Sequence, residues 1–308
     1  MRALLVVNPA ATTTSARTRR VLLRALASEL DLEVSETEYP GHAGDLARDA
    51  AAAGLDVVVA FGGDGTINEV VNGLITGAEG AATAQPDLAV VPGGSANVFP
   101  RALGLPREAV EATGAVIDAL RGGSRRLIGL GRAAERYFTV SAGLGIDAEV
   151  VRGVERLRDS GVRASPALYV WEALRQFFVV TDRREPQLTL DAGPSAEQVF
   201  LAIVSNASPW TYLGPRAVTP SPRASFDAGL DLYALRRLGT LGTLRQIRQM
   251  LTAGACIPTG RQVHTRHDVA ELTITARRPA AFQVDGEYLD ERDHVVFRSA
   301  RDALRVVV

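Results

Sequence analysis

One short loop carries the residue types best suited to chemistry in this chain: Gly62, Gly63, Asp64, Gly65 and Thr66. The apolar run 57–61 before it is typical of a strand buried on both faces, and a helical pattern follows from about Ile67. Glycine lets the backbone approach a ligand closely, and the N–H groups at a helix start attract phosphate. A carboxylate among such amides is useful where a divalent cation lies between it and the phosphates. The loop therefore predicts a nucleotide phosphate site, with a plain strand-to-helix turn capped by Thr66 as the alternative.

The basic residues narrow the chemistry further. All 34 of them are arginine, and the sequence contains no lysine. A Walker P-loop and a protein kinase both need a lysine on the nucleotide phosphates, and a pyridoxal enzyme needs one for its Schiff base. If the protein uses ATP, it must therefore hold the phosphates with backbone amides, arginine and metal.

Length and charge set the broad class. The 308 residues suggest two domains. The net charge of −1 gives no bulk attraction to nucleic acid or to an anionic membrane, although local arginine patches stay open, and we expect no nucleic-acid partner. Cys256 is the only cysteine, and the beginning MRALLVVNPA lacks the apolar core of a signal peptide, so we expect a cytoplasmic protein. No run approaches the roughly 20 apolar residues of a membrane-spanning helix, which makes any membrane contact peripheral.

Strand and helix patterns alternate over the first 130 or so residues. Strands are expected at 3–7, 32–37, 57–61 and 88–91, and helices at 18–30, 44–53, from 67, and at 108–120. This alternation predicts a parallel sheet that binds ligands at the carboxyl ends of its strands. A polar or glycine-rich loop follows each strand, at 8–12, 37–42, 62–66 and 92–97. Four such loops at one edge of a sheet predict a nucleotide cleft.

From about residue 133 the pattern changes to short strand-like runs separated by Gly, Pro and Asp turns. These runs lie at 137–142, 187–190, 198–204, 230–235, 270–276, 280–284 and 294–297. Their spacing predicts an antiparallel β-sandwich, interrupted by helices near 148–158, 166–178 and 241–251. We therefore expect two domains, 1–132 and 133–308, and the last strand is able to return to the first domain.

Taken together, the motifs resemble the diacylglycerol kinase catalytic family, which also includes sphingosine kinases and bacterial soluble lipid kinases. The resemblance runs nearly end to end through Asn8-Pro9, TEYPGHA from Thr37, GGDGTINEVVNG from Gly62, PGGSANVFPRALGLP from Pro92, DAGLD from Asp227 and VDGE from Val284. It implies an α/β nucleotide domain similar to that of phosphofructokinase and NAD kinase, followed by an antiparallel β-sandwich domain for the lipid. ATP and Mg²⁺ are expected in the cleft between them.

The resemblance also implies roles for individual residues. The ATP contacts would be Asn8, Pro9, Ala10, Ala11, Thr12, Thr37, Gly62, Gly63, Asp64, Gly65, Thr66, Ile67, Asn68, Gly94, Ser95 and Asn97. Asp64 would join the metal network, and Asp227 is a second candidate metal ligand. Asp285 would be the general base that takes the proton from the lipid hydroxyl, with Glu287 supporting it or contacting ATP and metal. A hairpin turn is the alternative for Asp-Gly at 285–286, since this dipeptide is a strong hairpin signal.

The sequence departs from the family at three places. Val98 stands where many bacterial members carry Asp, and Ala228 replaces the second Asp of an Asp-Asp-Gly motif that belongs to a structural Mg²⁺ site. The loop 11–15 lacks the usual glycine. These departures keep open a non-catalytic nucleotide- or lipid-binding member of the family. An NAD kinase is the second alternative, because it shares the GGDGT loop.

The resemblance implies a lipid substrate met at a membrane surface, in lipid metabolism and phospholipid biosynthesis; the identity of the lipid and a homodimeric state stay open. The segment 166–180, PALYVWEALRQFFVV, is interpreted as core, with an apolar helix beside a lipid entrance as the alternative. The stretch His264-Thr265-Arg266-His267 is interpreted as a solvated loop, with a metal site as the alternative.

Overall fold

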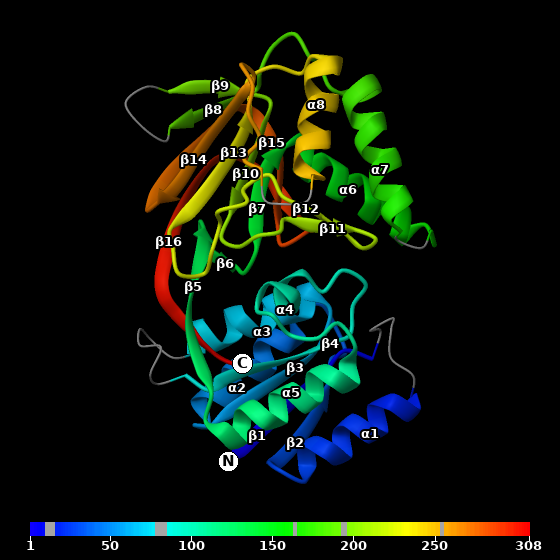
Figure 1. Ribbon diagram of the computed structural model, residues 1–308, viewed down its shortest axis with the longest axis vertical. Helices are drawn as coiled ribbons and strands as arrows, with labels where there is room; N and C mark the ends of the chain where they lie inside the picture. The colour runs from blue at the N-terminus through cyan, green and yellow to red at the C-terminus, as the bar shows by residue number, and fades with distance from the viewer. Residues whose placement is uncertain (10–15, 78–84, 163–164, 192–195, 253–255) are drawn as a thin grey trace. The chain divides into compact units, whose positions relative to one another are not determined.

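The computed structural model describes residues 1–9, 16–77, 85–162, 165–191, 196–252 and 256–308. Its internal contacts divide the chain into two compact units (Figure 1). The first consists of Met1–Leu130 together with Arg301–Val308, and the second of Gly131–Ala300. The nucleotide and lipid roles assigned to residues 1–132 and 133–308 stay predictions.

The first unit contains a parallel sheet whose strands follow the order β4-β3-β1-β2. Its strands are β1 (Arg2–Val7), β2 (Asp31–Glu36), β3 (Val57–Gly62) and β4 (Asp87–Pro92). The helices between them are α1 (Ala16–Ala27), α2 (His42–Ala52), α3 (Asp64–Gly77), α4 (Val98–Ala102) and α5 (Ala109–Gly122). The end of β16 (Glu287–Val307) pairs in parallel with β4 at Val306 and Leu88, so the chain's last strand completes this sheet.

Strands β1, β3 and β4 of this sheet are buried on both faces, which explains their continuous apolar runs, whereas the edge strand β2 is largely exposed. All six residues of β3 and all six of β4 are buried. On one face, alternate residues of β1 and β3, such as Leu5 and Val59, pack against Leu22 of α1 and Val116 of α5. Helices α2 and α3 pack closely on each other because Gly73 has no side chain. A Cβ at Gly73 would lie only 2.1 Å from the carbonyl oxygen of Gly44. The strands predicted here from apolar runs agree with β1 to β4 to within about two residues.

The second unit is rich in antiparallel strands, in the order β14-β13-β10-β7-β15-β16, with β8 on β15 and β9 on β8. Its strands are β6 (Arg136–Phe138), β7 (Ser141–Gly145), β8 (Leu188–Asp191), β9 (Glu197–Val199), β10 (Leu201–Ser205), β11 (Thr211–Leu213), β12 (Arg216–Val218), β13 (Leu230–Leu235), β14 (Val263–Val269) and β15 (Glu271–Val284). The strand β5 (Arg125–Ala133) passes from the first unit into the second.

The helices of the second unit are α6 (Ile146–Asp159), α7 (Pro166–Arg175), the π-helix η1 (Gln176–Val180) and α8 (Thr240–Met250). One core cluster brings Phe138, Phe282 and Phe297 together with aliphatic residues of β7, β10 and β13. A second cluster gathers Tyr233 and Met250 with the partly buried Phe177 of η1. None of the helices in the described part of the chain combines the length and apolar character that crossing a bilayer requires.

Two sequence interpretations of this unit are wrong. The HTRH stretch lies in strand β14, where His264 is buried with its Nδ1 3.0 Å from Glu197. Burial lowers the pKa of His264, although the charge of Glu197 acts in the opposite direction. The segment 166–180 is also not simply core, because Trp171 and Phe178 are each 52% exposed. An apolar sequence pattern does not show whether other elements of the protein pack on that segment and bury it.

Candidate functional site

The glycine loop joins β3 directly to helix α3. The helix begins at Asp64, three residues earlier than predicted, and the N–H of Ile67 donates to the carbonyl of Gly63 at 3.1 Å. Thr66 is therefore inside the first turn, so the alternative in which it is the N-cap is wrong. Its buried hydroxyl instead accepts a hydrogen bond from Nδ2 of Asn8 at 2.9 Å, which ties the end of β1 to the start of α3.

The Asp64 carboxylate holds the next loop in place. Its two oxygens accept hydrogen bonds from the backbone N–H groups of Val98 and Phe99, both at 3.0 Å. These N–H groups begin helix α4, where intrahelical partners are missing and a negative charge is favoured. Asp64 thus acts as a distant helix cap, and any contact with a metal would use lone pairs that the two amides leave over.

The loop 92–97 packs against the glycine loop through two glycines. A Cβ at Gly94 would lie only 2.7 Å from the Cα of Gly63, so the backbones approach as closely as they do because neither residue has a side chain. Asn97 fixes the loop from within, as its Oδ1 accepts from the Gly94 N–H at 2.9 Å and its Nδ2 donates to the Gly94 carbonyl at 2.7 Å. Ser95 is left exposed at the tip.

A polar cavity of about 270 Å³ opens beside this loop. Gly94, Ser95 and Asn97 line it, together with Thr18 of α1 and the guanidinium side chains of Arg101 and Arg107. Two arginines, a hydroxyl and loop backbone form a donor set suited to phosphate, and the acidic Glu108 lies on the same lining. Sequence reasoning missed both arginines, although a chain without lysine had to supply its phosphate-binding cations as arginine.

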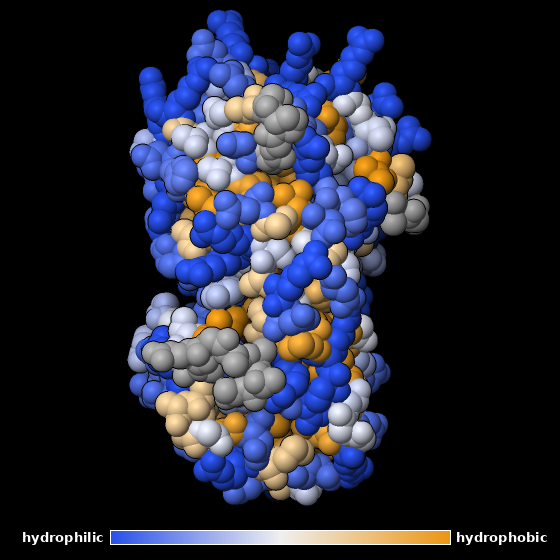
Figure 2. Space-filling view, turned by 90° about the vertical axis from the view of Figure 1, so that its left-hand side faces the viewer, coloured by the Kyte–Doolittle hydropathy of each residue, from blue (hydrophilic) through white to orange (hydrophobic). Residues whose placement is uncertain are grey.

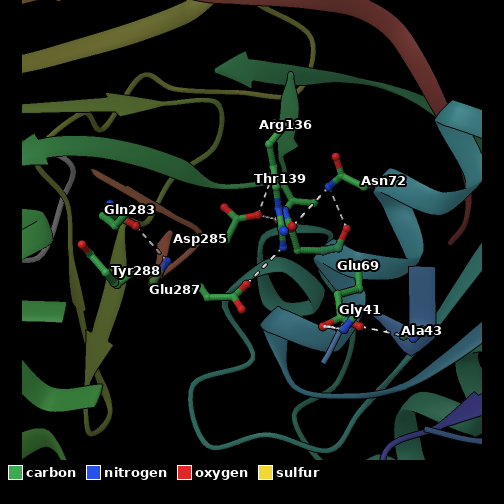
Figure 3. A network of polar contacts seen from close by, with 12 residues as sticks. Gly41, Ala43, Glu69, Asn72, Arg136, Thr139, Gln283, Asp285, Glu287 and Tyr288 are labelled. Carbon is green, nitrogen blue, oxygen red and sulfur yellow. Dashed lines mark hydrogen bonds and ion pairs between the residues drawn. The ribbon is translucent and has the colours of Figure 1, made fainter. Parts of the chain in front are cut away.

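Glu69 is another residue that the sequence did not single out. Its carboxylate accepts hydrogen bonds from the N–H groups of Gly41 at 2.9 Å and Ala43 at 3.2 Å, and so caps the start of helix α2 (Figure 3). The same helix α3 therefore caps α2 through Glu69 and α4 through Asp64. Asn68, one turn after Asp64, is buried.

The remaining predicted nucleotide contacts lie at strand ends of the same unit. Pro9 follows Asn8 after β1, and the N–H of Thr37 donates to the Val7 carbonyl at 2.9 Å at the end of β2. The strand ends thus meet at one edge of the sheet, as predicted from the alternation of strands and helices. Ala10, Ala11 and Thr12 lie outside the described residues.

In the second unit, the predicted base lies on a tight hairpin. Asp285 and Gly286 connect β15 to β16, with Val284 paired to Glu287, and both turn residues have positive φ, 48° and 80°. Such a two-residue turn demands this backbone, which Asp and Gly tolerate well. The hairpin predicted from the Asp-Gly dipeptide is present, and it presents the Asp285 side chain toward β6 and β7 (Figure 3).

Four donors surround the Asp285 carboxylate. One oxygen accepts from the N–H and the hydroxyl of Thr139, both at 2.8 Å, and the other accepts from the N–H groups of Val140 at 2.9 Å and Ser141 at 3.0 Å. Consecutive backbone N–H groups of this kind form an anion-binding nest. Three of the donors are fixed backbone, whereas the Thr139 hydroxyl is able to rotate away.

Two consecutive hydrogen bonds connect the same hairpin to the buried side chains of Gln283 and Asp147. The N–H of Gly286 donates to Oε1 of Gln283 at 2.9 Å, and Nε2 of Gln283 donates to Asp147 at 2.7 Å. Asp147 lies in the first turn of α6, and burial raises its pKa to about 6, although the Gln283 bond acts to lower it. The order of donors fixes the orientation of the Gln283 amide, because Gly286 can only donate.

Glu287 lies at the other side of the turn, where its carboxylate accepts from Nη2 of Arg136 at 3.1 Å. Both side chains are partly exposed, 40% and 28%, so the ion pair is worth little to stability. Asp227 lies in an exposed turn, where its N–H donates to the Ser225 hydroxyl at 3.3 Å. Across the described residues, no group of three or more His, Cys, Asp or Glu side chains is arranged to hold a metal ion.

The sequence is similar to that of known proteins. The model of the diacylglycerol kinase catalytic domain matches residues 2–132. A diacylglycerol kinase of Staphylococcus saprophyticus is 30% identical over 87% of this chain and 82% of its own length. One from Staphylococcus epidermidis is 35% identical over 82% of this chain and 74% of its own length. The match to the Bacillus subtilis enzyme, 43% identical, spans only 33% of that protein.

The fold agrees with the same comparison. A crystal structure of a Bacillus anthracis diacylglycerol kinase superimposes with a TM-score of 0.71, covering 99% of this chain and 96% of that one at 19% identity. The chain has a mixed α/β fold with a β-rich C-terminal part, and it belongs to the diacylglycerol kinase family, a family of lipid kinases.

Proposed function

We propose that the protein transfers the γ-phosphate of ATP to the hydroxyl of a lipid such as diacylglycerol. Family membership supports the reaction class, the VDGE motif carries the choice of Asp285 as base, and the hydrogen bonds around Asp285 fix the orientation of its carboxylate. In the same proposal the first unit is a phosphofructokinase-like nucleotide domain, and the second is a β-sandwich domain for the lipid. The lipid would be met at a membrane surface, with no nucleic acid among the partners.

The residues of the first unit suit ATP. The cavity beside the loop 92–97 offers Arg101, Arg107 and Thr18 to phosphate oxygens, and the start of α3 adds backbone N–H groups. Mg²⁺ in kinase sites is held by one or two carboxylates plus phosphate oxygens and water, so Asp64 with the nucleotide would be sufficient. When bound, Mg²⁺ neutralises charge on the phosphates. Asp227 remains a weaker candidate because it lies in an exposed turn.

In the second unit the Thr139 hydroxyl donates a hydrogen bond to one oxygen of the Asp285 carboxylate. In this proposal the hydroxyl of the lipid replaces it as the donor to that oxygen. When the lipid hydroxyl takes this position, Asp285 accepts its proton. The lipid oxygen then forms a bond to the γ-phosphorus as the bond to the bridging oxygen of ADP breaks. Glu287 would orient the site rather than accept the proton, as Arg136 already neutralises it.

The test measures transfer of labelled phosphate from ATP to diacylglycerol, ceramide, sphingosine, phosphatidylinositol and NAD. We expect a phosphorylated lipid, and a reduction of kcat by roughly 10²–10⁴ in Asp285→Asn with ATP affinity unchanged in calorimetry. Thr139→Val is the matched control, because it removes one donor and keeps the carboxylate; its kcat should stay within about tenfold. Phosphate transfer to NAD alone would identify an NAD kinase. ATP binding without transfer to any acceptor would identify a non-catalytic member of the family. A fully active Asp285→Asn enzyme would show that another residue is the base.

A further inference from the structure

Helix α8 shows the reverse of the usual surface-helix pattern. The Gln246 side chain is 2% exposed and donates from Nε2 to the Thr259 carbonyl at 3.1 Å. Leu241, Leu244 and Ile247 are 85%, 56% and 45% exposed on the other side. A surface helix ordinarily turns its apolar stripe toward the core. Here the stripe points away from the core of its own unit.

A second exposed apolar surface lies on α7 and η1. Six of its side chains are between 43% and 77% exposed: Val170, Trp171, Leu174, Phe178, Val179 and Val180. Val170, Trp171 and Leu174 also line a groove of about 500 Å³ that Leu213 and Gly214 close on the other side. Large exposed apolar areas of this kind mark a binding surface.

Arg183 joins the two surfaces. Its guanidinium lies 5.1 Å and 5.7 Å from the ring centres of Phe177 and Phe178, and its Nη1 donates to the Thr240 hydroxyl at the start of α8 at 3.4 Å. In Figure 1 the helices α7 and α8 lie side by side within the second unit. We call the exposed residues of α7, η1 and α8 together the apolar face.

The charge around the α8 part of the apolar face is one-sided, whereas Asp182 and Glu185 accompany Arg183 and Arg184 after η1. Residues 232–267 contain six arginines and no Asp or Glu, although the whole chain has a net charge of −1. Arg245 and Arg248 are exposed on α8 beside Leu244 and Ile247. A basic helix with an outward apolar stripe matches the interface of a membrane that contains anionic lipid. A second copy of the chain fits less well, because a two-fold interface would bring two sets of these arginines to the same interface.

Another face of the second unit provides a contrast. Figure 2 shows hydrophilic side chains projecting from its upper end, with apolar patches lying between hydrophilic neighbours. That face is suited to water, whereas the apolar face keeps nine large apolar side chains exposed on adjoining elements.

We propose that the apolar face docks onto an anionic lipid bilayer, with its apolar side chains in the interfacial zone and its arginines at the headgroup phosphates. The inference rests on the proposed function in one respect, since a lipid substrate is held in a bilayer. The face would keep the second unit at the membrane while a lipid is taken up.

Vesicle sedimentation tests the proposal, with vesicles of phosphatidylcholine alone or mixed with phosphatidylglycerol. We expect Leu241→Ser with Leu244→Ser to weaken partitioning into the mixed vesicles by at least about tenfold. Arg245→Gln with Arg248→Gln should weaken it by about 30-fold, about fivefold for each charge, and should leave binding to neutral vesicles unchanged. Val34→Ser is the control, because Val34 is 43% exposed in the first unit, does not line the polar cavity beside the loop 92–97, and should have no effect.

Two further measurements separate the explanations. Turnover on a water-soluble, short-chain diacylglycerol should be the same in all these variants, because the substituted residues lie outside the proposed catalytic site. If the wild type phosphorylates no lipid while the vesicle results hold, the kinase proposal fails and the docking face stands. Unchanged vesicle binding in both double variants overturns the docking face, and a changed molar mass in light scattering without a vesicle effect would make it a self-association surface.

Discussion

The effect of replacing Asp147 with asparagine on the stability of the second unit should depend on pH and be most favourable at alkaline pH. Burial raises the pKa of Asp147 from 3.8 to about 6, so the folded state binds its proton more tightly than the unfolded state does. The wild type therefore loses stability as the pH rises from the unfolded pKa to the folded pKa. Asp147→Asn removes this loss and keeps an oxygen that accepts the Gln283 bond.

The magnitude follows from the two pKa values. Their difference of about two pH units corresponds to about 3 kcal/mol at about pH 8, and about half of this remains at about pH 5. The amide nitrogen buried in place of an oxygen sets a constant cost of about 1–3 kcal/mol, which lowers the gain equally at every pH. The difference between the two pH values, about 1.5 kcal/mol, is therefore the firm part of the prediction.

Tryptophan fluorescence provides a selective assay, because both tryptophans of the chain, Trp171 and Trp210, belong to the second unit. Urea unfolding of the wild type and of Asp147→Asn at about pH 5 and pH 8 gives the four free energies that are needed. Asp159→Asn, an exposed position of the same helix, should change stability by less than about 0.5 kcal/mol. A gain of the same size at both pH values would refute the assignment of the charge penalty to Asp147.

Three other substitutions test the first unit and the hairpin. Asp64→Ala removes the cap of α4 and should lower stability by about 1–3 kcal/mol and turnover by orders of magnitude; a wild-type rate at saturating Mg²⁺ would contradict its proposed role. Asp87→Asn leaves Arg125 and Arg305 without their shared carboxylate and should lower the thermal midpoint of the first unit, whereas an unchanged midpoint would make both ion pairs dispensable. Glu287→Gln should reduce kcat much less than Asp285→Asn and change stability by under about 1 kcal/mol; an equal loss of kcat would make Glu287 a partner in proton transfer.

The parallel sheet was predictable mainly because its strands β1, β3 and β4 are apolar on both faces. In β3 and β4 every residue is buried, so the local run is itself the signature. The start of α3 was not predictable, since Gly-Asp-Gly has low helix propensity. Its stabilising contacts include the Asp64 bonds to Val98 and Phe99, which are 34 and 35 residues away.

In the second unit, local sequence patterns predicted where the strands and helices lie, but not which residues surround them. The runs at 270–276 and 280–284 form the single strand β15, with a register shift between Thr275 and Ala280. The hairpin at Asp285 was predictable from its Asp-Gly dipeptide, but the donors from Thr139 to Ser141 come from about 145 residues earlier in the chain. The exposure of Trp171 was not predictable either, because it depends on what the other elements leave uncovered.

The return of the last strand has a consequence for biosynthesis. Residues Arg301–Val308 belong to the first unit, and Val306 pairs with Leu88 beside the buried strand β4. A ribosome therefore releases all of the second unit before the first can complete its sheet. Until then β4 is an apolar edge strand, and such edges are prone to aggregate. A fragment that stops near residue 130 would keep this edge permanently, whereas an expression design that fuses 301–308 after that point would close it.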